Sequence, residues 1–145
     1  MTDGFPAHRA HAGIWKGTYR HLGADGALEA ETASTVWCEF PEQGPVFYRQ
    51  RIELVSSAGE VTRASFDGTA RGDHLWFDTP TFTGRSWETA DGVVLLNLQR
   101  RDEPGAHFVE VIILAEGGLR RARTWHWFRD GALFRRTLCD EARVG

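Results

Sequence analysis

Arginine and tryptophan alternate near the C-terminal end of the sequence, in a pattern suited to binding a small anionic molecule. Arg123, Trp125 and Trp127 are spaced two residues apart, so on a β-strand their side chains project from one face. A guanidinium group can hold a carboxylate or a phosphate through two parallel hydrogen bonds, and indole rings form flat apolar walls. This spacing predicts a binding surface for an organic acid with an aromatic or apolar body.

These residues lie in a predicted β-hairpin that spans Gly118 to Asp140. Its centre is Asp130-Gly131, and a two-residue Asp-Gly loop is typical of a hairpin with a type I′ turn. That turn sets a register in which Trp127 pairs with Phe134. The face that carries the guanidinium groups and rings then consists of Arg121, Arg123, Trp125, Trp127, Phe134, Arg136, Leu138 and Asp140.

A carboxylate is expected beside this surface. The strand predicted over residues 107–115 joins the hairpin through Glu116-Gly117-Gly118, and either two-residue placement of that turn puts Glu110 on the face of Arg123. Because an unpaired buried charge is costly, we expect Glu110 and Arg123 to form an ion pair if this face is enclosed.

The elements that must position these residues are short antiparallel strands. From Gly13 onward, apolar and polar residues alternate with a period of two, and turn-forming residues separate the runs, which is typical of an all-β meander. Closing about ten such strands into a single up-and-down antiparallel β-barrel removes the exposed edges of an open sheet. We predict a flexible N-terminal tail over residues 1–11 and one barrel domain over 12–145, with strands at 13–22, 28–40, 46–55, 60–67, 73–78, 82–88, 92–100, 107–115 and in the two arms of the hairpin.

The first predicted hairpin indicates which residues face the interior of the barrel. Its Asp25-Gly26 turn pairs Arg20 with Glu31 on a charged, solvent-facing side, so the opposite side with Trp15 points inward. The predicted cavity is lined by Trp15, Tyr19, His21, Tyr48, Gln50, Phe108, Glu110, Arg123, Trp125, Trp127 and Arg136, of which all but Trp15, His21 and Phe108 are expected to bind the ligand. Few polar groups in an aromatic pocket are typical of a small-molecule site, and we expect a ligand that is anionic or phenolic at one end.

The opposite orientation of the C-terminal strands is an alternative. If Val109, Val111 and Ile113 line the interior, the arginine and tryptophan side chains form an outer ladder stabilised by cation–π stacking. With the arginine face inward, the same apolar run faces solvent, and an exposed apolar stripe suggests a homodimer interface.

The composition restricts the class of protein. The net charge is −3 and Lys16 is the single lysine among the 17 basic residues, which provides no general basic surface for nucleic acid. The N-terminal segment lacks the apolar run of a signal peptide, and no run of residues is long and apolar enough for a membrane span. We therefore expect a cytoplasmic protein without nucleic-acid or membrane partners, in which Cys38 and Cys139 stay reduced.

The start of the first predicted strand resembles a known motif. Gly13-Ile14-Trp15 is similar to the Gly-x-Trp motif of the calycins, the superfamily of lipocalins and fatty-acid-binding proteins. In those proteins an arginine on the last strands lies across the tryptophan and closes one end of the barrel, and the resemblance implies this role for Arg135 or Arg136. Residues 13–20 and 123–131 resemble uncharacterised bacterial lipocalin-like proteins of a domain-of-unknown-function family. The resemblance implies a calycin-like barrel that holds a small molecule in its cavity.

Two other functions fit the same barrel. A small lyase, isomerase or cyclase would use Glu110, His21 or Tyr48 to move a proton. The start of the chain also resembles the haem-binding nitrobindin barrels, which would make His126 a candidate haem ligand. The sequence contains neither a zinc-binding spacing nor a recognisable Ser-His-Asp set, so we expect no metal site, and haem is the one cofactor considered.

Overall fold

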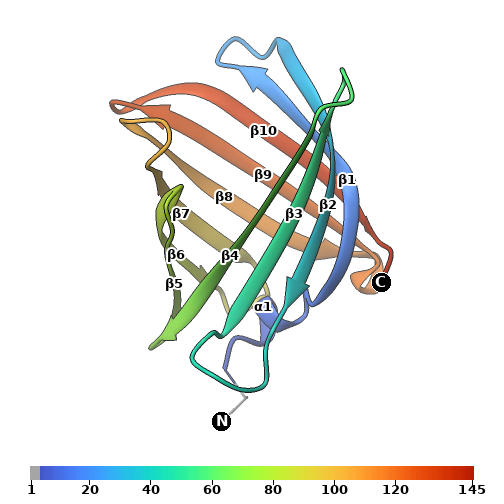
Figure 1. The fold of residues 1–145 in the computed structure, drawn as a ribbon, viewed down its shortest axis with the longest axis vertical. Helices are drawn as coiled ribbons and strands as arrows, with labels where there is room; N and C mark the ends of the chain where they lie inside the picture. The colour runs from blue at the N-terminus through green and yellow to red at the C-terminus, as the bar shows by residue number, and fades with distance from the viewer. Residues whose placement is uncertain (1–3) are drawn as a thin grey trace.

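The computed structural model describes residues 4–145, which consist almost entirely of antiparallel β-strands (Figure 1). Along each strand the side chains alternate between a core and solvent, as the period-two pattern of the sequence predicts. In chain order the elements are α1 (Pro6–Arg9), β1 (Gly13–Gly23), β2 (Leu28–Glu39), β3 (Tyr48–Ser56), β4 (Val61–Arg71), β5 (His74–Asp78), β6 (Phe82–Glu88), β7 (Val94–Arg100), β8 (Ala106–Ala115), the 3₁₀-helix η1 (Glu116–Gly118), β9 (Arg120–Arg129) and β10 (Ala132–Arg143).

The strands follow one another around a closed barrel, in which each pairs with its neighbours in the sequence. The last strand, β10, returns to lie beside β1 (Figure 1). This arrangement confirms the predicted single up-and-down barrel of ten strands. Within residues 4–145, no helix has the length and apolar character needed to cross a lipid bilayer.

The two predicted Asp-Gly turns occur where the sequence places them. Between β9 and β10, Asp130 and Gly131 both have positive φ angles, 50° and 83°, as a type I′ turn requires. Between β1 and β2, the pairing of Arg20 with Glu31 is also as predicted. Short-range turn chemistry therefore locates both hairpins correctly.

The predicted register of the β9–β10 hairpin is wrong beyond Leu133. A β-bulge at Phe134 inserts one extra residue into β10, so Arg135 rather than Phe134 pairs with Trp127. One extra residue reverses which side chains of a strand face the interior. Arg136 therefore lies outside the cavity lining, and the inward side chains beyond the bulge are Arg135, Thr137, Cys139 and Glu141.

The arginine and tryptophan face of β9 points into the barrel. The side chains of Arg123, Trp125 and Trp127 belong to residues that are 7%, 4% and 7% exposed, whereas Ile113 on the outer face of β8 is 45% exposed. The alternative orientation, with the apolar side of β8 inside, is therefore wrong.

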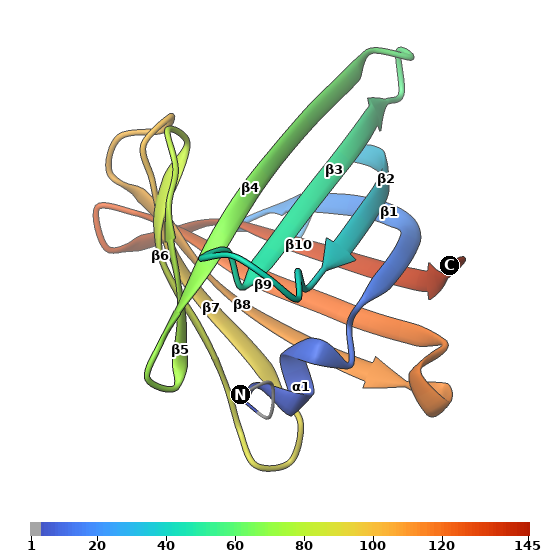
Figure 2. The same cartoon turned by 60° about the horizontal axis from the view of Figure 1, so that its bottom comes forward.

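Residues 5–11 cover one end of the barrel. Helix α1 lies at that end, near the connection between β6 and β7 (Figure 2), and His8 and His11 are buried there. The backbone N–H groups of Ala7 and His8 donate to the carboxylate of Glu88, and Phe5 joins the aromatic core. A carboxylate 80 residues away in the sequence therefore binds this segment. The flexibility of the tail stays a prediction. Residues 1–3 of the predicted tail lie outside the described residues.

Trp15 seals the same end of the barrel. It is fully buried, its indole N–H donates to the carbonyl oxygen of His11 at 3.0 Å, and the guanidinium groups of Arg121 and Arg143 lie 4.7 and 4.4 Å from its ring. The implied role of Arg135 or Arg136 is wrong, since both residues follow the turn at the opposite end of β10. Trp15 pairs instead with the far end of that strand, at Arg143.

One part of the barrel wall is incomplete. β4 pairs with β5 only over residues 68–71, so within the described chain the edge of β4 at residues 61–67 has no strand beside it. The two strands diverge there (Figure 2). Thr62 and Ala64 belong to the cavity lining and are nevertheless exposed to solvent, which shows that the cavity opens through this part of the wall.

Candidate ligand-binding cavity

A cavity of about 650 Å³ occupies the interior of the barrel. It extends from His8 and His11 beside α1 to Arg100 and Arg135 near the turns at the opposite end. Most of the side chains between these ends are apolar or aromatic. A volume of this size lies within the range of about 300–1,000 Å³ typical of small-molecule sites.

Aromatic rings on neighbouring strands form the walls of the cavity. Tyr19 and Trp125 meet edge to face with ring centroids 5.3 Å apart, and Phe108 lies 4.8 Å from Trp127. These spacings lie in the range preferred by aromatic pairs, so the rings stabilise one another while leaving space between them. The walls are therefore built to contact a flat apolar molecule.

Arg123 lies at the centre of a buried polar network. Its Nε donates to Glu110 at 2.8 Å, and its Nη1 donates to the Tyr19 hydroxyl at 2.9 Å and to Glu141 at 3.5 Å. Burial by itself would lower the pKa of Arg123, but Glu110, Tyr19 and Glu141 outweigh it and raise that pKa well above its usual range. Burial raises the pKa of the Tyr19 hydroxyl, which therefore stays protonated.

Arg121 extends this network toward the sealed end. Its guanidinium group is paired with the carboxylate of Glu141 and also lies 3.7 Å from Cys38 Sγ. Two arginines and two glutamates thus face each other in the interior, and their formal charges cancel. The deep part of the cavity therefore offers no unbalanced positive charge to a ligand.

His11 carries a polar atom without a partner. Its Nδ1 lies 3.4 Å from Arg121 Nη1, which must be the donor, so the imidazole hydrogen is on Nε2. Burial, together with the charge of Arg121, lowers the pKa of His11 to about 3, which keeps the ring neutral. Within residues 4–145, the buried Nε2 has no hydrogen-bond partner.

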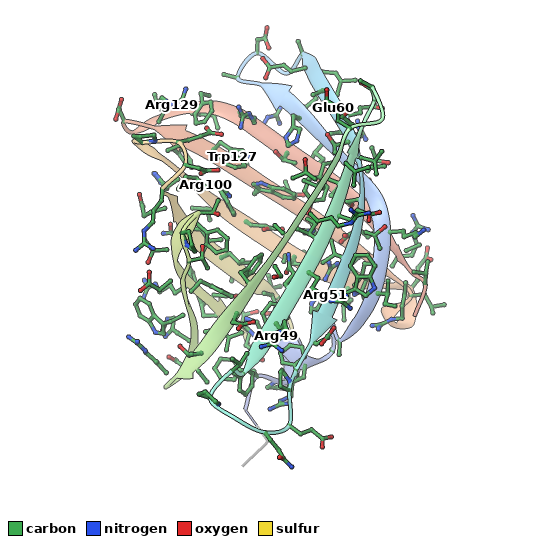
Figure 3. The ribbon with its side chains drawn as sticks, in the orientation of Figure 1. Arg49, Arg51, Glu60, Arg100, Trp127 and Arg129 are labelled. Atoms are coloured by element: carbon green, nitrogen blue, oxygen red, sulfur yellow. The ribbon has the colours of Figure 1, made fainter. Side chains whose placement is uncertain are left out.

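The mouth of the cavity carries a less strongly paired guanidinium group. Arg100 lies over the ring of Trp127 at 5.7 Å (Figure 3), and its guanidinium pairs with Asp102 at 2.7 Å. Arg135 lies over the same ring at 5.1 Å, but its carboxylate partner, Glu103, is 4.0 Å away. Among the arginines that line the cavity, Arg135 therefore has the weakest carboxylate pairing.

The structure brings most of the predicted ligand-binding residues to the cavity. Arg136 is the exception, because the bulge turns it away, and Arg135 takes its place. The members that do line the cavity are Tyr19, Tyr48, Gln50, Glu110, Arg123, Trp125 and Trp127. Their roles in binding stay predictions.

Sequence reasoning misses four inward residues of β10, because the register error places them on the outer face: Arg135, Thr137, Cys139 and Glu141. The position of the bulge has no evident signal in the sequence, since Phe134 is equally compatible with either face of the strand.

The three candidate proton-transfer groups have separate partners. Glu110 pairs with Arg123, and the Tyr48 hydroxyl donates to Gln50 at 2.6 Å. His21 Nδ1 lies 2.8 Å from the hydroxyl oxygen of Thr137, which also accepts a hydrogen bond from the indole N–H of Trp127 at 2.9 Å. Burial lowers the pKa of His21, which favours the neutral ring.

The side chains that could bind a cofactor do not come together in the cavity. His126 is exposed on the outer face of β9. Among residues 4–145, no three His, Cys, Asp or Glu side chains come together in the geometry of a metal site.

The closed antiparallel barrel and its sealed tryptophan end define a calycin-like fold. Among similar solved structures, an S-type phycobiliprotein lyase from Guillardia theta superposes with a TM-score of 0.76 and 16% identity, over 95% of this chain and 90% of that one. A protein of unknown function from the DUF3598 family of Nostoc punctiforme gives a TM-score of 0.72 and 20% identity, over 94% of this chain and 49% of that one. The protein EF1p2_mFAP2b bound to DFHBI gives 0.53 and 10%, over 95% and 97% of the two chains.

These identities establish similarity of fold alone. No family model matches the sequence, and no curated protein matches it.

Proposed function

We propose that the barrel binds a small, flat, largely apolar organic acid. The observation that carries this proposal is the cavity of about 650 Å³, with aromatic walls and a guanidinium group at its mouth. Apolar contact with the rings would supply most of the binding free energy, and the few polar groups would orient the ligand.

The balance of charges favours one orientation of the ligand. The deep arginines are neutralised by Glu110 and Glu141, whereas Arg135 is only loosely paired with Glu103. The apolar body would therefore lie between Trp125 and Trp127, and the anionic or phenolic end would stay near Arg135. This orientation replaces Arg136 with Arg135 as the group that holds the acid.

The similar solved structures support a small-molecule role for this fold. One is named a phycobiliprotein lyase, and another was solved bound to DFHBI. The first name also favours the second candidate function, a lyase, isomerase or cyclase. In such an enzyme, Glu110, His21 or Tyr48 would transfer a proton. Haem binding is the weaker alternative, because His126 lies outside the cavity.

A matched pair of fluorescent probes tests the binding proposal. 1-Anilinonaphthalene-8-sulfonate and N-phenyl-1-naphthylamine share a flat ring system, but only the first carries an anion. We expect both to bind with micromolar affinity, and Arg135→Gln to weaken the anionic probe about 5-fold, which corresponds to about 1 kcal/mol. The neutral probe should bind the variant as it binds the wild type. Arg136→Gln, which changes an arginine outside the cavity, is the control.

Two results would contradict the proposal. If neither probe binds the folded protein, the cavity does not admit a flat molecule. If Arg135→Gln weakens both probes equally, Arg135 does not hold the anionic end.

Three further expectations stay predictions: a cytoplasmic location, the lack of nucleic-acid and membrane partners, and a homodimer. The apolar stripe of β8 does face outward, with Ile113 exposed and Val109 and Val111 half-buried. We expect Ile113→Lys to convert a dimer to a monomer in sedimentation velocity. A wild-type protein that sediments as a monomer at high concentration would contradict the dimer.

A further inference from the structure

A serine, a histidine and a glutamate form a continuous hydrogen-bonded chain at the α1 end of the cavity. His8 Nε2 lies 2.7 Å from Ser86 Oγ, and His8 Nδ1 lies 2.7 Å from Glu88 Oε1. Ser86 and Glu88 are two residues apart on β6, so both project from the same face of that strand. His8 comes from α1 and joins them across 78 residues of sequence. The order of groups is that of a serine nucleophile, its base and the carboxylate that orients the base.

The carboxylate of Glu88 determines which imidazole nitrogen carries hydrogen. It accepts from the backbone N–H groups of Ala7 at 2.9 Å and His8 at 3.0 Å. Burial would raise the pKa of Glu88, but the hydrogen bonds from His8 and Ala7 outweigh it and lower that pKa. An ionised Glu88 has only acceptor atoms, so His8 Nδ1 must be the donor.

Burial also governs the other nitrogen of His8. It lowers the pKa of the imidazole, against the opposing effect of Glu88, and so favours the neutral ring. With its hydrogen on Nδ1, the neutral ring presents a lone pair at Nε2 to the hydroxyl of Ser86. The Ser86 hydroxyl donates to the carbonyl oxygen of Leu95 at 2.9 Å, which holds the side chain in this position. Its single hydrogen must therefore turn from that carbonyl to His8 Nε2 before it can be transferred.

The triad is placed where a bound molecule can meet it. Ser86 and His8 are 2% and 6% exposed, and both belong to the cavity lining, so the route to the serine is through the cavity. One turn after His8, the neutral imidazole of His11 adds an N–H group that has no partner within residues 4–145. A nucleophile, a base and an unused donor thus belong to the lining of the same aromatic pocket.

We propose that Ser86, His8 and Glu88 hydrolyse small esters of apolar or aromatic acids. Ser86 Oγ attacks the ester carbonyl while its proton moves to His8 Nε2, and the tetrahedral intermediate collapses as His8 returns that proton to the departing alcohol. Water then attacks the acyl-serine as its proton moves to His8 Nε2. When the bond between the acyl carbon and Ser86 Oγ breaks, His8 returns that proton to Oγ, which releases the acid and the free serine. Glu88 holds the imidazole in the required tautomer, and the N–H of His11 donates to the carbonyl oxygen. This activity goes beyond ligand binding but uses the same cavity.

Hydrolysis of p-nitrophenyl acetate and p-nitrophenyl butyrate by the full chain tests the proposal. We expect Ser86→Ala to reduce the rate at least about 100-fold, toward the uncatalysed rate, as the loss of a nucleophile does. The control is Ser57→Ala, which removes an exposed serine of the β3–β4 turn outside the cavity lining and should leave the rate unchanged. Glu88→Gln should lower the turnover rate more than it changes KM, because it acts through His8.

A covalent label provides a readout that does not depend on turnover. Diisopropyl fluorophosphate should add one diisopropylphosphoryl group, with loss of fluoride, and peptide mass spectrometry should place it on Ser86. A folded wild-type protein that is neither labelled nor active on the esters would overturn the proposal, as would labelling elsewhere or full activity in Ser86→Ala.

The naphthalene probes separate this proposal from the binding proposal. If Ser86→Ala still binds both probes but has lost hydrolysis, the serine is chemical rather than structural. If the wild type hydrolyses esters but binds neither probe, the triad stands and the binding proposal fails.

Discussion

Arg123 and Glu110 form an ion pair inside the barrel, with Arg123 Nε 2.8 Å from Glu110 Oε2 and side chains that are 8% and 3% exposed. The two residues come from adjacent strands, β9 and β8, and the Tyr19 hydroxyl from β1 completes the contact. A pair this deep cannot use solvent to stabilise either charge. Each partner therefore depends on the other.

Glu110→Gln should lower the free energy of unfolding by about 3 kcal/mol, because it leaves the guanidinium of Arg123 short of a carboxylate in a buried site. Urea unfolding followed by tryptophan fluorescence measures this change. The double variant Glu110→Leu/Arg123→Met should regain most of the loss. If Glu110→Gln is as stable as the wild type, the pair does not depend on burial.

Arg143→Ala should open the sealed end of the barrel. Its guanidinium stacks on Trp15 and donates to the carbonyl oxygens of Ala10, Ala12 and Gly118, so one side chain ties together the N-terminal segment and η1. We expect a loss of about 2 kcal/mol in unfolding free energy, the scale of charged hydrogen bonds. The emission of Trp15 should shift to longer wavelength, and Arg120→Ala on the exposed side should have little effect. An unshifted spectrum would count against the seal.

These two sites show how far the sequence alone leads. The alternation of side chains predicts the strands, and the turn at Glu116-Gly117-Gly118 places Glu110 on the same face as Arg123. Neither signal reports long-range contacts. The pairing of Trp15 with Arg143 spans most of the chain, and α1 has only four residues and depends on Glu88.

The sequence predicts neither the bulge at Phe134 nor the triad, for related reasons. A bulge is one extra residue in a strand, and local β-propensity does not indicate where it occurs. Its position nevertheless decides whether Arg135 or Arg136 reaches the cavity. The Ser86, His8 and Glu88 chain joins β6 to the N-terminal segment, and no spacing in the sequence indicates that contact.

Stability should fall as the pH is lowered from 7 to 5. The pKa of His11 is about 3 in the folded protein, below the ordinary 6.5, so protons bind the unfolded chain first and favour unfolding throughout this interval. A single histidine contributes at most about 1.4 kcal/mol per pH unit. The pKa values of His8 and His21 are also lowered by burial, and these residues act in the same direction.

The non-titrating variant His11→Gln isolates the effect of one ring. Its unfolding free energy should vary less steeply with pH than that of the wild type, although it will still fall. Glu88, which contacts the same N-terminal segment, interferes little above pH 5, since its ordinary pKa is 4.5 and folding lowers that pKa. Parallel curves for the variant and the wild type would show that His11 does not carry this dependence.

Filling the cavity should abolish probe binding without unfolding the barrel. Leu96 lines the cavity on β7, and Leu96→Trp adds an indole to the space between the aromatic walls. We expect both naphthalene probes to bind at least about 10-fold more weakly, a loss of about 1.4 kcal/mol. Val111→Trp, on the outer face of β8, is the control. Equal effects of the two variants would place the probes outside the cavity.

The unpaired edge of β4 should be visible in amide hydrogen exchange. Over residues 61–67, every second amide points to the side where β5 is missing and has no backbone acceptor there. We expect these amides to exchange far faster than those of β3, which is paired on both sides by β2 and β4. Nuclear magnetic resonance resolves the individual rates. Uniform protection along β4 would mean that the wall is closed in solution.

The β-bulge at Phe134 also limits how the number of residues in β10 can vary. Loss of Phe134 itself would leave a regular strand with Arg135 still opposite Trp127. With the bulge retained, however, loss of one residue between Arg135 and Asp140 would bring Asp140 into the lumen and turn Glu141, which neutralises Arg121 and Arg123, to the outside. β10 tolerates the deletion or insertion of residues only in even numbers, or when a second change of register restores which side chains face the cavity. The number of residues in β10 is thus constrained by which side chains must face the cavity, and the residue composition does not reveal this constraint.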